Sequence, residues 1–187
     1  MILANRRAAA FLALALLAWA GGCGRGRTPQ GDWPLGFHLE VDADFRPSGM
    51  QRPNGEGSLY FLHGDEPDQP RLVVRKRRLR LSLQETLEES LELGEGPRVL
   101  EQGEPFRVQA LNAAGLGARQ RVMPFPEADS SLVLLFDTRV FLVGDFSYAF
   151  HWQQPPGDSD VLRRYEGWLR HLRFASPDSA GITGERP

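Results

Sequence analysis

Cysteine is almost absent from this chain of 187 residues, because Cys23 is the only one. A single thiol excludes an internal disulfide framework and a cysteine-based zinc site. Catalytic signatures are missing too: the sequence has no Gly-x-Ser-x-Gly elbow, no Walker phosphate loop and no His-Glu-x-x-His pair. We therefore expect no enzyme activity, no catalytic residues, no cofactor and no metal.

The chain also lacks an excess of basic charge and a long hydrophobic segment. Its formal net charge is −2, whereas nucleic-acid-binding domains carry a pronounced basic surface, so we exclude nucleic acid as a partner. The apolar run at residues 8–20 follows Arg6 and Arg7. It is shorter than the roughly 20 residues that a membrane-spanning helix needs. A basic start, a short apolar run and small residues are typical of a secretory signal peptide.

Cys23 directly follows Gly21 and Gly22 at the end of this segment. The segment resembles a bacterial lipoprotein leader, which implies cleavage before Cys23, lipidation of its sulfur and acylation of the new amino terminus. Two or more acyl chains anchor a protein stably to a membrane. Gly24, rather than Asp, follows the cysteine, which favours the outer membrane and a periplasm-facing domain. A plain signal peptide with an incidental cysteine and a retained membrane anchor are the alternatives.

Composition divides the chain into four parts. Residues 1–22 form the predicted signal peptide, and residues 23–34, rich in Gly, Arg and Pro, are expected to be a flexible tether. Residues 35–174 are long enough for one domain with a single core. Residues 175–187 are expected to be a disordered tail, because they can bury little apolar surface.

Alternating apolar and polar residues predict most of the strands. The alternation from His38 to Phe45 predicts a first strand, and short apolar runs predict strands at 57–63 and 71–74, joined by a turn at 64–67. Apolar positions change parity after Val74, so we expect a bulge or turn within residues 75–78. Asp137-Thr138-Arg139, between two apolar runs, is interpreted as a hairpin turn. The remaining strands are predicted at 99–100, 106–110, 120–123, 132–136, 140–143 and 146–152.

Two amphipathic helices are predicted. Ser82 and Glu85 form a capping box at the start of the first, in which Leu83, Leu87 and Leu91 recur every four residues. The second begins near Ser159 and has one apolar stripe, formed by Val161, Leu162, Tyr165, Leu169 and Leu172. Because each helix has a single apolar stripe, we expect an α+β fold in which helices pack on one face of an antiparallel sheet.

This order of elements resembles the Mog1/PsbP-like domain of bacterial lipoproteins of the DcrB type. The residues that carry the resemblance are 36–41 (Gly-Phe-His-Leu-Glu-Val), 82–87 (Ser-Leu-Gln-Glu-Thr-Leu), 111–115 (Leu-Asn-Ala-Ala-Gly) and 165–174 (Tyr-Glu-Gly-Trp-Leu-Arg-His-Leu-Arg-Phe). The resemblance implies a non-enzymatic scaffold that binds a partner.

The densest charge run is the main candidate for a binding surface. It consists of Arg75, Lys76, Arg77, Arg78 and Arg80. On a membrane-tethered protein such residues can contact anionic headgroups or an acidic partner, each contributing about 1 kcal/mol near an anionic surface. The alternative is an edge strand that its charges protect from pairing with another sheet.

Three other patterns have a functional and a structural interpretation. His38, Glu40, Asp42 and Asp44 share one side of the predicted first strand, but same-face residues lie roughly 7 Å apart, so a solvated face is favoured over a metal site. The sequence His63-Gly64-Asp65 beside Glu66 contains a base and a carboxylate, and we interpret it as an ordinary turn.

The aromatic stripe from Phe146 to Trp152, with Trp168, is assigned to the core, with a ligand groove under the second helix as the alternative.

Together these patterns predict a lipid-anchored accessory or protein-binding domain of the cell envelope, with an envelope protein as its partner. The alternatives are an immunity lipoprotein that neutralises a secreted toxin and a carrier of a small ligand or lipid.

Overall fold

The computed structural model describes residues 32–63, 66–78, 81–93, 97–124, 133–154 and 159–175. Cys23, Arg80 and the predicted signal peptide lie outside the described residues, as do most of the predicted tether and tail. The predictions made for those residues therefore stay predictions.

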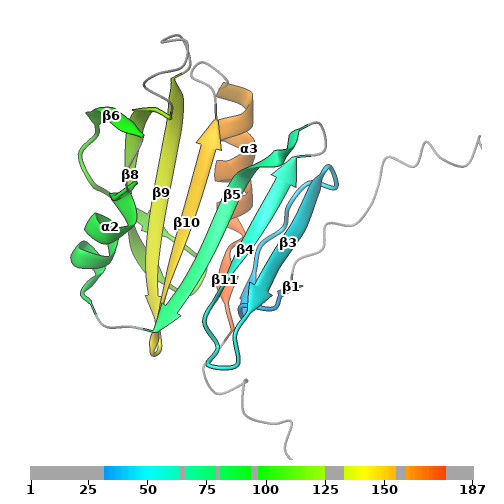
Figure 1. Cartoon of the computed structure of the whole chain (residues 1–187). Helices are drawn as coiled ribbons and strands as arrows, with labels where there is room; N and C mark the ends of the chain where they lie inside the picture. Colours follow the sequence, from blue (N-terminus) through cyan, green and yellow to red (C-terminus); the bar gives the residue numbers. More distant parts are fainter. Residues whose placement is uncertain are drawn as a thin grey trace, which may run out of the picture.

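Eight strands form one antiparallel sheet, in the order β3-β4-β5-β10-β9-β8-β6, with β7 also paired to β8 (Figure 1). The strands are β3 (Phe45–Gln51), β4 (Gly57–His63), β5 (Glu66–Arg78), β6 (Arg98–Gln102), β7 (Phe106–Gln109), β8 (Ala114–Met123), β9 (Leu134–Val143) and β10 (Phe146–Gln154). A smaller sheet joins β1 (Asp32–Trp33), β2 (Phe37–His38) and β11 (Arg173–Phe174). The large sheet therefore brings β5 and β10, which are distant in sequence, side by side.

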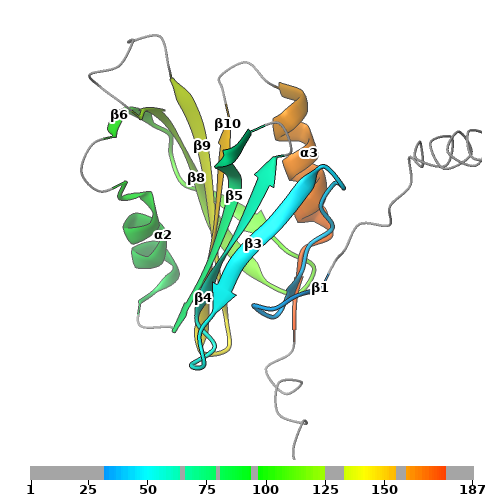
Figure 2. The ribbon, with the colours of Figure 1, turned by 45° about the vertical axis from the view of Figure 1, so that its right-hand side comes forward.

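The helices α2 (Leu83–Leu91) and α3 (Ser159–Arg170) lie on opposite sides of the large sheet, as Figure 2 shows. Leu87 and Leu91 of α2 pack with Ala149 of β10 in one cluster, whereas Trp168 of α3 packs with Phe150 of β10 in the other. The α+β class and the antiparallel sheet are confirmed. The expectation that helices pack on one face is wrong, because adjacent residues of β10 are buried on both faces.

The face covered by α3, here called the α3 face, holds the main core. The Trp152 ring stacks on the Tyr165 ring with centroids 4.8 Å apart and planes 8° from parallel. The Phe45 and Trp168 rings are nearly perpendicular, with centroids 4.8 Å apart. Because these rings fill the space between α3 and the sheet, the assignment of the aromatic stripe to the core is confirmed.

The predicted first strand is wrong between residues 39 and 44, which belong to neither helix nor strand. Leu39 and Val41 are buried, but Ala43 is exposed, so the alternation is incomplete. The indole N–H of Trp33 donates to the carbonyl oxygen of Leu39 at 2.8 Å. This bond ties the segment to the small sheet, and the first strand of the large sheet begins only at Phe45.

Two predicted irregularities are also misplaced. Strand β5 pairs with β10 without interruption from Leu72 to Arg78, so there is no bulge at residues 75–78; the register shifts lie at residues 61–63 of β4 instead. Asp137, Thr138 and Arg139 do not form a hairpin turn, because they lie within the continuous strand β9. The turn that follows contains Gly144, whose φ of 55° suits glycine.

The first predicted helix is confirmed in detail. The Ser82 hydroxyl accepts from the Glu85 backbone N–H at 3.3 Å, and the Glu85 carboxylate accepts from the Ser82 backbone N–H at 2.8 Å. The Glu85 carboxylate also accepts from the Ser82 hydroxyl at 2.6 Å, and this bond, together with the one from the Ser82 backbone N–H, lowers the pKa of the Glu85 carboxyl. The capping box therefore starts α2 where the sequence predicts.

Candidate functional site: a groove on the α2 face

The basic run divides between the two faces of the sheet. Arg75 pairs in register with Ala149, on the face that α2 covers, here called the α2 face. Lys76 pairs with Tyr148, which belongs to the core of the α3 face. The interpretation of residues 75–78 as a single surface is therefore wrong, because successive strand residues point to opposite sides. Their contact with a partner or with headgroups stays a prediction.

The edge-strand alternative is wrong as well. Strand β5 carries the run and lies between β4 and β10 in the sheet order. Since both sides of β5 are paired, its charges do not serve to protect an open edge.

Lys76 has a structural role. Its ammonium group donates to the carbonyl oxygen of Leu35 at 2.9 Å and lies 4.2 Å from the centroid of the Phe146 ring. The same carbonyl oxygen accepts from the Tyr148 hydroxyl at 3.0 Å. Burial lowers the pKa of Lys76 and raises the pKa of Tyr148 to about 12. Lys76 and Tyr148 together hold the segment at Leu35 against the core.

Arg78 contributes to the loop before β4 through its main chain. Its backbone N–H donates to the Glu56 carboxylate at 2.9 Å, while its side chain is exposed. Arg80 lies outside the described residues. Of the five predicted contact residues, only Arg75 and Arg77 are placed together on the α2 face.

Two hollows follow one another along the α2 face. The larger, of about 860 Å³, is bordered by Ser48, Ser58, Tyr60, Arg75 and Arg77, among others. The smaller, of about 350 Å³, lies beside α2 and is bordered by Val73, Arg75, Ser90, Leu93, Phe136 and His151, among others. Arg75 borders both hollows, so we treat them as one feature and call it the α2-face groove.

The two arginines of the groove differ in their partners. Arg77 forms an ion pair with Glu89 of α2, with 2.7 Å between Nη1 and Oε1. Arg75 has neither an ion pair nor a side-chain hydrogen bond with any residue in the described part of the chain. Its exposed guanidinium is therefore available to a ligand.

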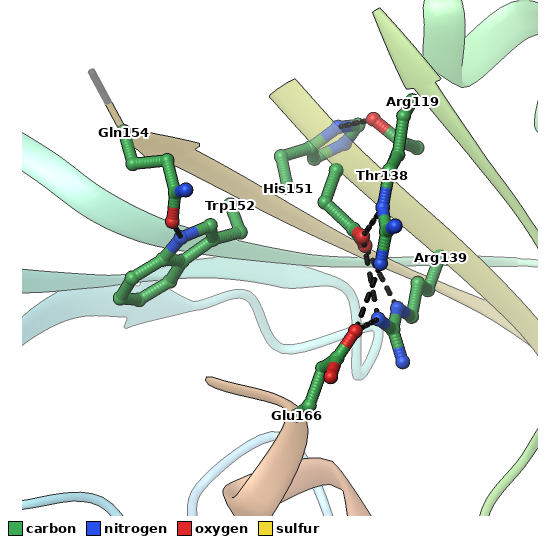
Figure 3. A network of polar contacts seen from close by, with 8 residues as sticks. Arg119, Thr138, Arg139, His151, Trp152, Gln154 and Glu166 are labelled. Carbon is green, nitrogen blue, oxygen red and sulfur yellow. Dashed lines mark hydrogen bonds and ion pairs between the residues drawn. The ribbon is translucent and has the colours of Figure 1, made fainter. Parts of the chain in front are cut away.

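His151 lies next to Arg75 in the groove. Its Nδ1 atom is 3.3 Å from the Thr138 hydroxyl oxygen, as Figure 3 shows. Burial, reinforced by the charges of Arg75 and Arg77, lowers the pKa of His151 from 6.5 to about 4. The imidazole is therefore neutral at neutral pH, and Arg75 supplies the positive charge at this position.

A second polar cluster, which the sequence analysis missed, lies on the α3 face (Figure 3). The Asp137 carboxylate is fully buried. It accepts hydrogen bonds from Arg139 Nε at 2.7 Å and from Arg119 Nε at 2.9 Å. Arg119 also binds Glu166 of α3 at 2.8 Å. Two cations thus match two carboxylates, and we call these four residues the charge network.

The charge network holds α3 against the sheet. Phe106 lies 5.4 Å and 5.7 Å from the Arg119 and Arg139 guanidinium carbons, and so covers both groups. Tyr165 of α3 packs beneath Arg139, with 5.2 Å from the guanidinium carbon to its ring, and burial raises its pKa well above 10. Because each buried charge has an opposite partner, we interpret the network as structural.

The sequence did contain a signal for this cluster. Hairpin turns commonly contain Gly or Asn, and residues 137–139 contain neither, whereas Gly144 follows seven residues after Asp137. Moving the turn to Gly144 makes Asp137 and Arg139 same-face residues of one strand.

The acidic residues near the amino end of the domain contact basic side chains. His38 lies 3.6 Å from Glu40, while Arg164 of α3 contacts Asp42 at 3.0 Å and Asp44 at 3.8 Å. Across the described ranges, no three His, Cys, Asp or Glu side chains are grouped as metal ligands. His63 and Glu66 are register partners, and Gly64 and Asp65 lie outside the described residues.

Among the helices that the structure describes, neither has the length and apolar character needed to cross a membrane.

Comparison with known proteins gives a likeness of fold. No protein-family model and no curated protein matches the sequence. Among solved structures, cyanobacterial PsbP (CyanoP) from Synechocystis sp. PCC 6803 matches with a TM-score of 0.56 and 10% identity, over 81% of this chain and 95% of that one. The chain has a PsbP-like fold. This confirms the PsbP-like architecture that the sequence predicts, but a fold alone does not name a function.

Two further solved structures show weaker similarity. LpqN, described as involved in cell envelope biogenesis of Mycobacterium tuberculosis, has a TM-score of 0.49 and 9% identity, over 74% of this chain and 83% of its own. A protein from Bacteroides thetaiotaomicron VPI-5482 has a TM-score of 0.47 and 11% identity, over 82% of this chain. This chain spans 50% of the Bacteroides protein.

Proposed function

We propose that this PsbP-like domain is a lipid-anchored, non-catalytic binding protein of the bacterial cell envelope. In this proposal Cys23 carries the acyl chains, the domain faces the periplasm from the outer membrane, and the α2-face groove binds an envelope protein. The observation that carries the proposal is the groove itself, which contains the Arg75 guanidinium, a group without an ion-pair partner among the described residues.

The geometry of the groove favours binding over catalysis. His151 is the candidate base, but burial and nearby cations lower its pKa to about 4, far from the value near 7 that suits a general base at neutral pH. Thr138, the hydroxyl beside it, is buried and only 2% exposed. A substrate in the groove therefore meets a weak base and a hydroxyl that it cannot reach.

A lipid carrier is less consistent with this surface. Carriers of acyl chains need a largely apolar cavity, whereas the α2-face groove places serines and charged residues, among them Ser58, Arg75 and Glu92, beside apolar ones such as Phe136. The aromatic rings on the α3 face pack against one another in the core. An immunity protein that blocks a toxin remains a form of protein binding and can use the same groove.

The lipid anchor is tested by metabolic labelling with palmitate and cell fractionation. We expect the wild-type protein to carry label and to sediment with outer membranes, and Cys23→Ala to lose both properties. A mature protein without fatty acid, or a cytosolic protein with its leader intact, would overturn the anchor.

The binding surface is tested by site-specific photo-crosslinking in intact cells. The photoreactive residue replaces either Tyr60, which borders the groove, or Leu100, an exposed residue of β6. Strand β6 lies at the opposite end of the strand order from β3 and β4. We expect a discrete crosslinked envelope protein from position 60 and none from position 100. Crosslinking from Leu100 alone, or from neither position, contradicts the proposed binding surface.

A further inference from the structure

We propose that the α2-face groove binds an extended, acidic segment of the partner protein, and that a carboxylate of this segment pairs with Arg75. This inference rests on the proposed function and names the chemistry of the partner.

The neighbours of Arg75 leave its guanidinium open to a ligand. In the register of the sheet, Arg75 lies between Ser58 of β4 and Ala149 of β10. Both neighbours are small, so neither covers the arginine side chain. An arginine guanidinium presents parallel N–H groups that match the two oxygens of a carboxylate. The strands therefore present a carboxylate-binding group on a rigid support.

The contrast with Arg77 shows why Arg75 is the anchoring residue. The ion pair between Arg77 and Glu89 neutralises the next arginine on the same face. Arg75, in contrast, has no carboxylate partner within the described ranges. An incoming carboxylate at Arg75 forms a new pair without breaking an existing one.

The shape of the groove fits an extended segment. It runs past Val73, Arg75 and Arg77, three successive residues on one face of β5. At roughly 3.3 Å per residue, this part of the strand spans about 13 Å. That length accommodates about four residues of extended peptide, and the hollow of about 860 Å³ is larger than a single small anion requires.

The charges around the groove favour a peptide over an anionic membrane. Glu92 borders the groove just after the end of α2, and Glu85 and Glu88 are exposed on the helix itself. These carboxylates repel a surface of anionic headgroups that approaches Arg75, because like charges raise the energy of contact. A narrow peptide brings a single carboxylate to Arg75 without placing a continuous anionic surface against the glutamates of α2.

The first test repeats the crosslinking from position 60 in cells that also carry Arg75→Gln. We expect the crosslinked product to fall at least fivefold, and to be unchanged with Arg107→Gln, an exposed arginine on β7 that three strands separate from β5. If the product persists undiminished in Arg75→Gln, the carboxylate inference is wrong while the proposed function stands. If the wild-type sequence at position 75 yields no product, the proposed function itself is wrong.

The second test identifies the source of the anion with purified full-length lipoprotein in neutral detergent. The probes are the peptide acetyl-Gly-Ser-Glu-Ser-Gly-amide and its counterpart with Gln in place of Glu. Binding is monitored by nuclear magnetic resonance through the arginine Nε and His151 ring signals. We expect the Glu peptide alone to shift the Arg75 and His151 signals, with at least tenfold weaker binding to Arg75→Gln. Equal binding of both peptides, or no shift with 20 mM Glu peptide, overturns the inference.

Vesicles form the third arm of the test. Phosphatidylglycerol vesicles are compared with phosphatidylcholine vesicles for binding to the Cys23→Ala full-length chain, which lacks the proposed anchor. We expect the binding of this chain to phosphatidylglycerol vesicles, relative to phosphatidylcholine vesicles, to be the same with and without the Arg75→Gln change. Loss of phosphatidylglycerol binding in the Arg75→Gln variant would assign Arg75 to headgroups and overturn the peptide assignment.

Discussion

The two faces of the sheet differ in whether their charged side chains have partners of opposite charge. On the α3 face, the buried Asp137 carboxylate is bonded by Arg119 and Arg139, and Glu166 completes a network with equal numbers of both charges. On the α2 face, Arg75 is exposed and has no ion-pair partner in the described part of the chain. Burying an unpaired charge is costly, whereas water solvates an exposed one. The cation without a partner in the described ranges therefore lies where a ligand can reach it.

Removal of the buried carboxylate is the change with the largest expected effect. Asp137→Asn leaves Arg139 buried beside a neutral amide, and breaking a buried ion pair costs about 3–5 kcal/mol. We expect the free energy of unfolding, measured by urea denaturation with tryptophan fluorescence, to fall by this amount. The control Glu101→Gln breaks an exposed pair with Arg121 and should cost less than about 1 kcal/mol. Equal losses in both variants would contradict a structural charge network.

Truncation of the α2 contact is expected to cost less. Leu87 is fully buried against Ala118 and Val140, and Leu→Ala changes in cores cost roughly 2–5 kcal/mol. Because the groove beside α2 allows the helix to relax, we expect about 2–3 kcal/mol for Leu87→Ala. Urea denaturation gives the value. A loss greater than that of Asp137→Asn would show that the α2 face is the more tightly packed of the two.

Acid pH is expected to weaken the α2 face through His151. The unfolded chain protonates this imidazole near pH 6.5, but the folded protein only near pH 4. Between these values the unfolded state binds more protons, so stability falls as the pH decreases from 6.5 to 4, by about 1–2 kcal/mol at pH 5. Arg75 and Arg77 oppose protonation, while Glu89 of α2 and Glu92 directly after it border the same hollows as the imidazole.

Urea denaturation at a series of pH values checks this expectation. The His151→Gln variant keeps a polar group beside Thr138 but cannot titrate, so its stability should decrease less over this range. Identical pH profiles for wild type and variant would contradict a neutral His151.

Loss of the helix cap is a smaller perturbation. Ser82→Ala removes the hydroxyl that accepts from the Glu85 backbone N–H, and such changes typically cost about 1 kcal/mol. Thermal unfolding followed by circular dichroism measures the effect. Gln84→Ala, a change at an exposed position in the first turn of α2, serves as the control. Its free energy of unfolding should stay within about 0.5 kcal/mol of wild type. A neutral Ser82→Ala would mean that packing of Leu87 alone sets the start of α2.

The smallest effect on stability is expected at the residue that matters most for binding. Arg75→Gln breaks no ion pair within the described ranges, so its free energy of unfolding should stay within about 0.5 kcal/mol of wild type. Urea denaturation checks this. A destabilisation comparable to that of Asp137→Asn would assign Arg75 to the structure and remove the contrast between the two faces.

Local chemistry predicted the elements that depend on local interactions. The capping box at Ser82 starts α2, and the short apolar run at 57–63 corresponds to β4. The alternation also placed the rings of Phe150 and Trp152 in the core. These features depend on residues a few positions apart, so the sequence contains the information directly.

The candidate site was predictable only in part. The basic run identified Arg75 and Arg77, but the pattern also included Lys76, which contacts Leu35, a residue 41 positions away in sequence. The sequence pattern predicts a turn at residues 137–139, because two charged residues flanking a threonine are uncommon inside a buried strand. Their burial depends on Arg119 and Glu166, which come from other elements.

The sequence by itself determined the α+β class, the helix starts and the placement of the only thiol after a short apolar run, because each of these depends on local propensity and spacing. Tertiary structure alone decided which helix covers which face, which charges are paired, and that Arg75 borders a groove. Alternation along a strand specifies which residues share a face, but the partner of that face is set by contacts between segments far apart in the chain.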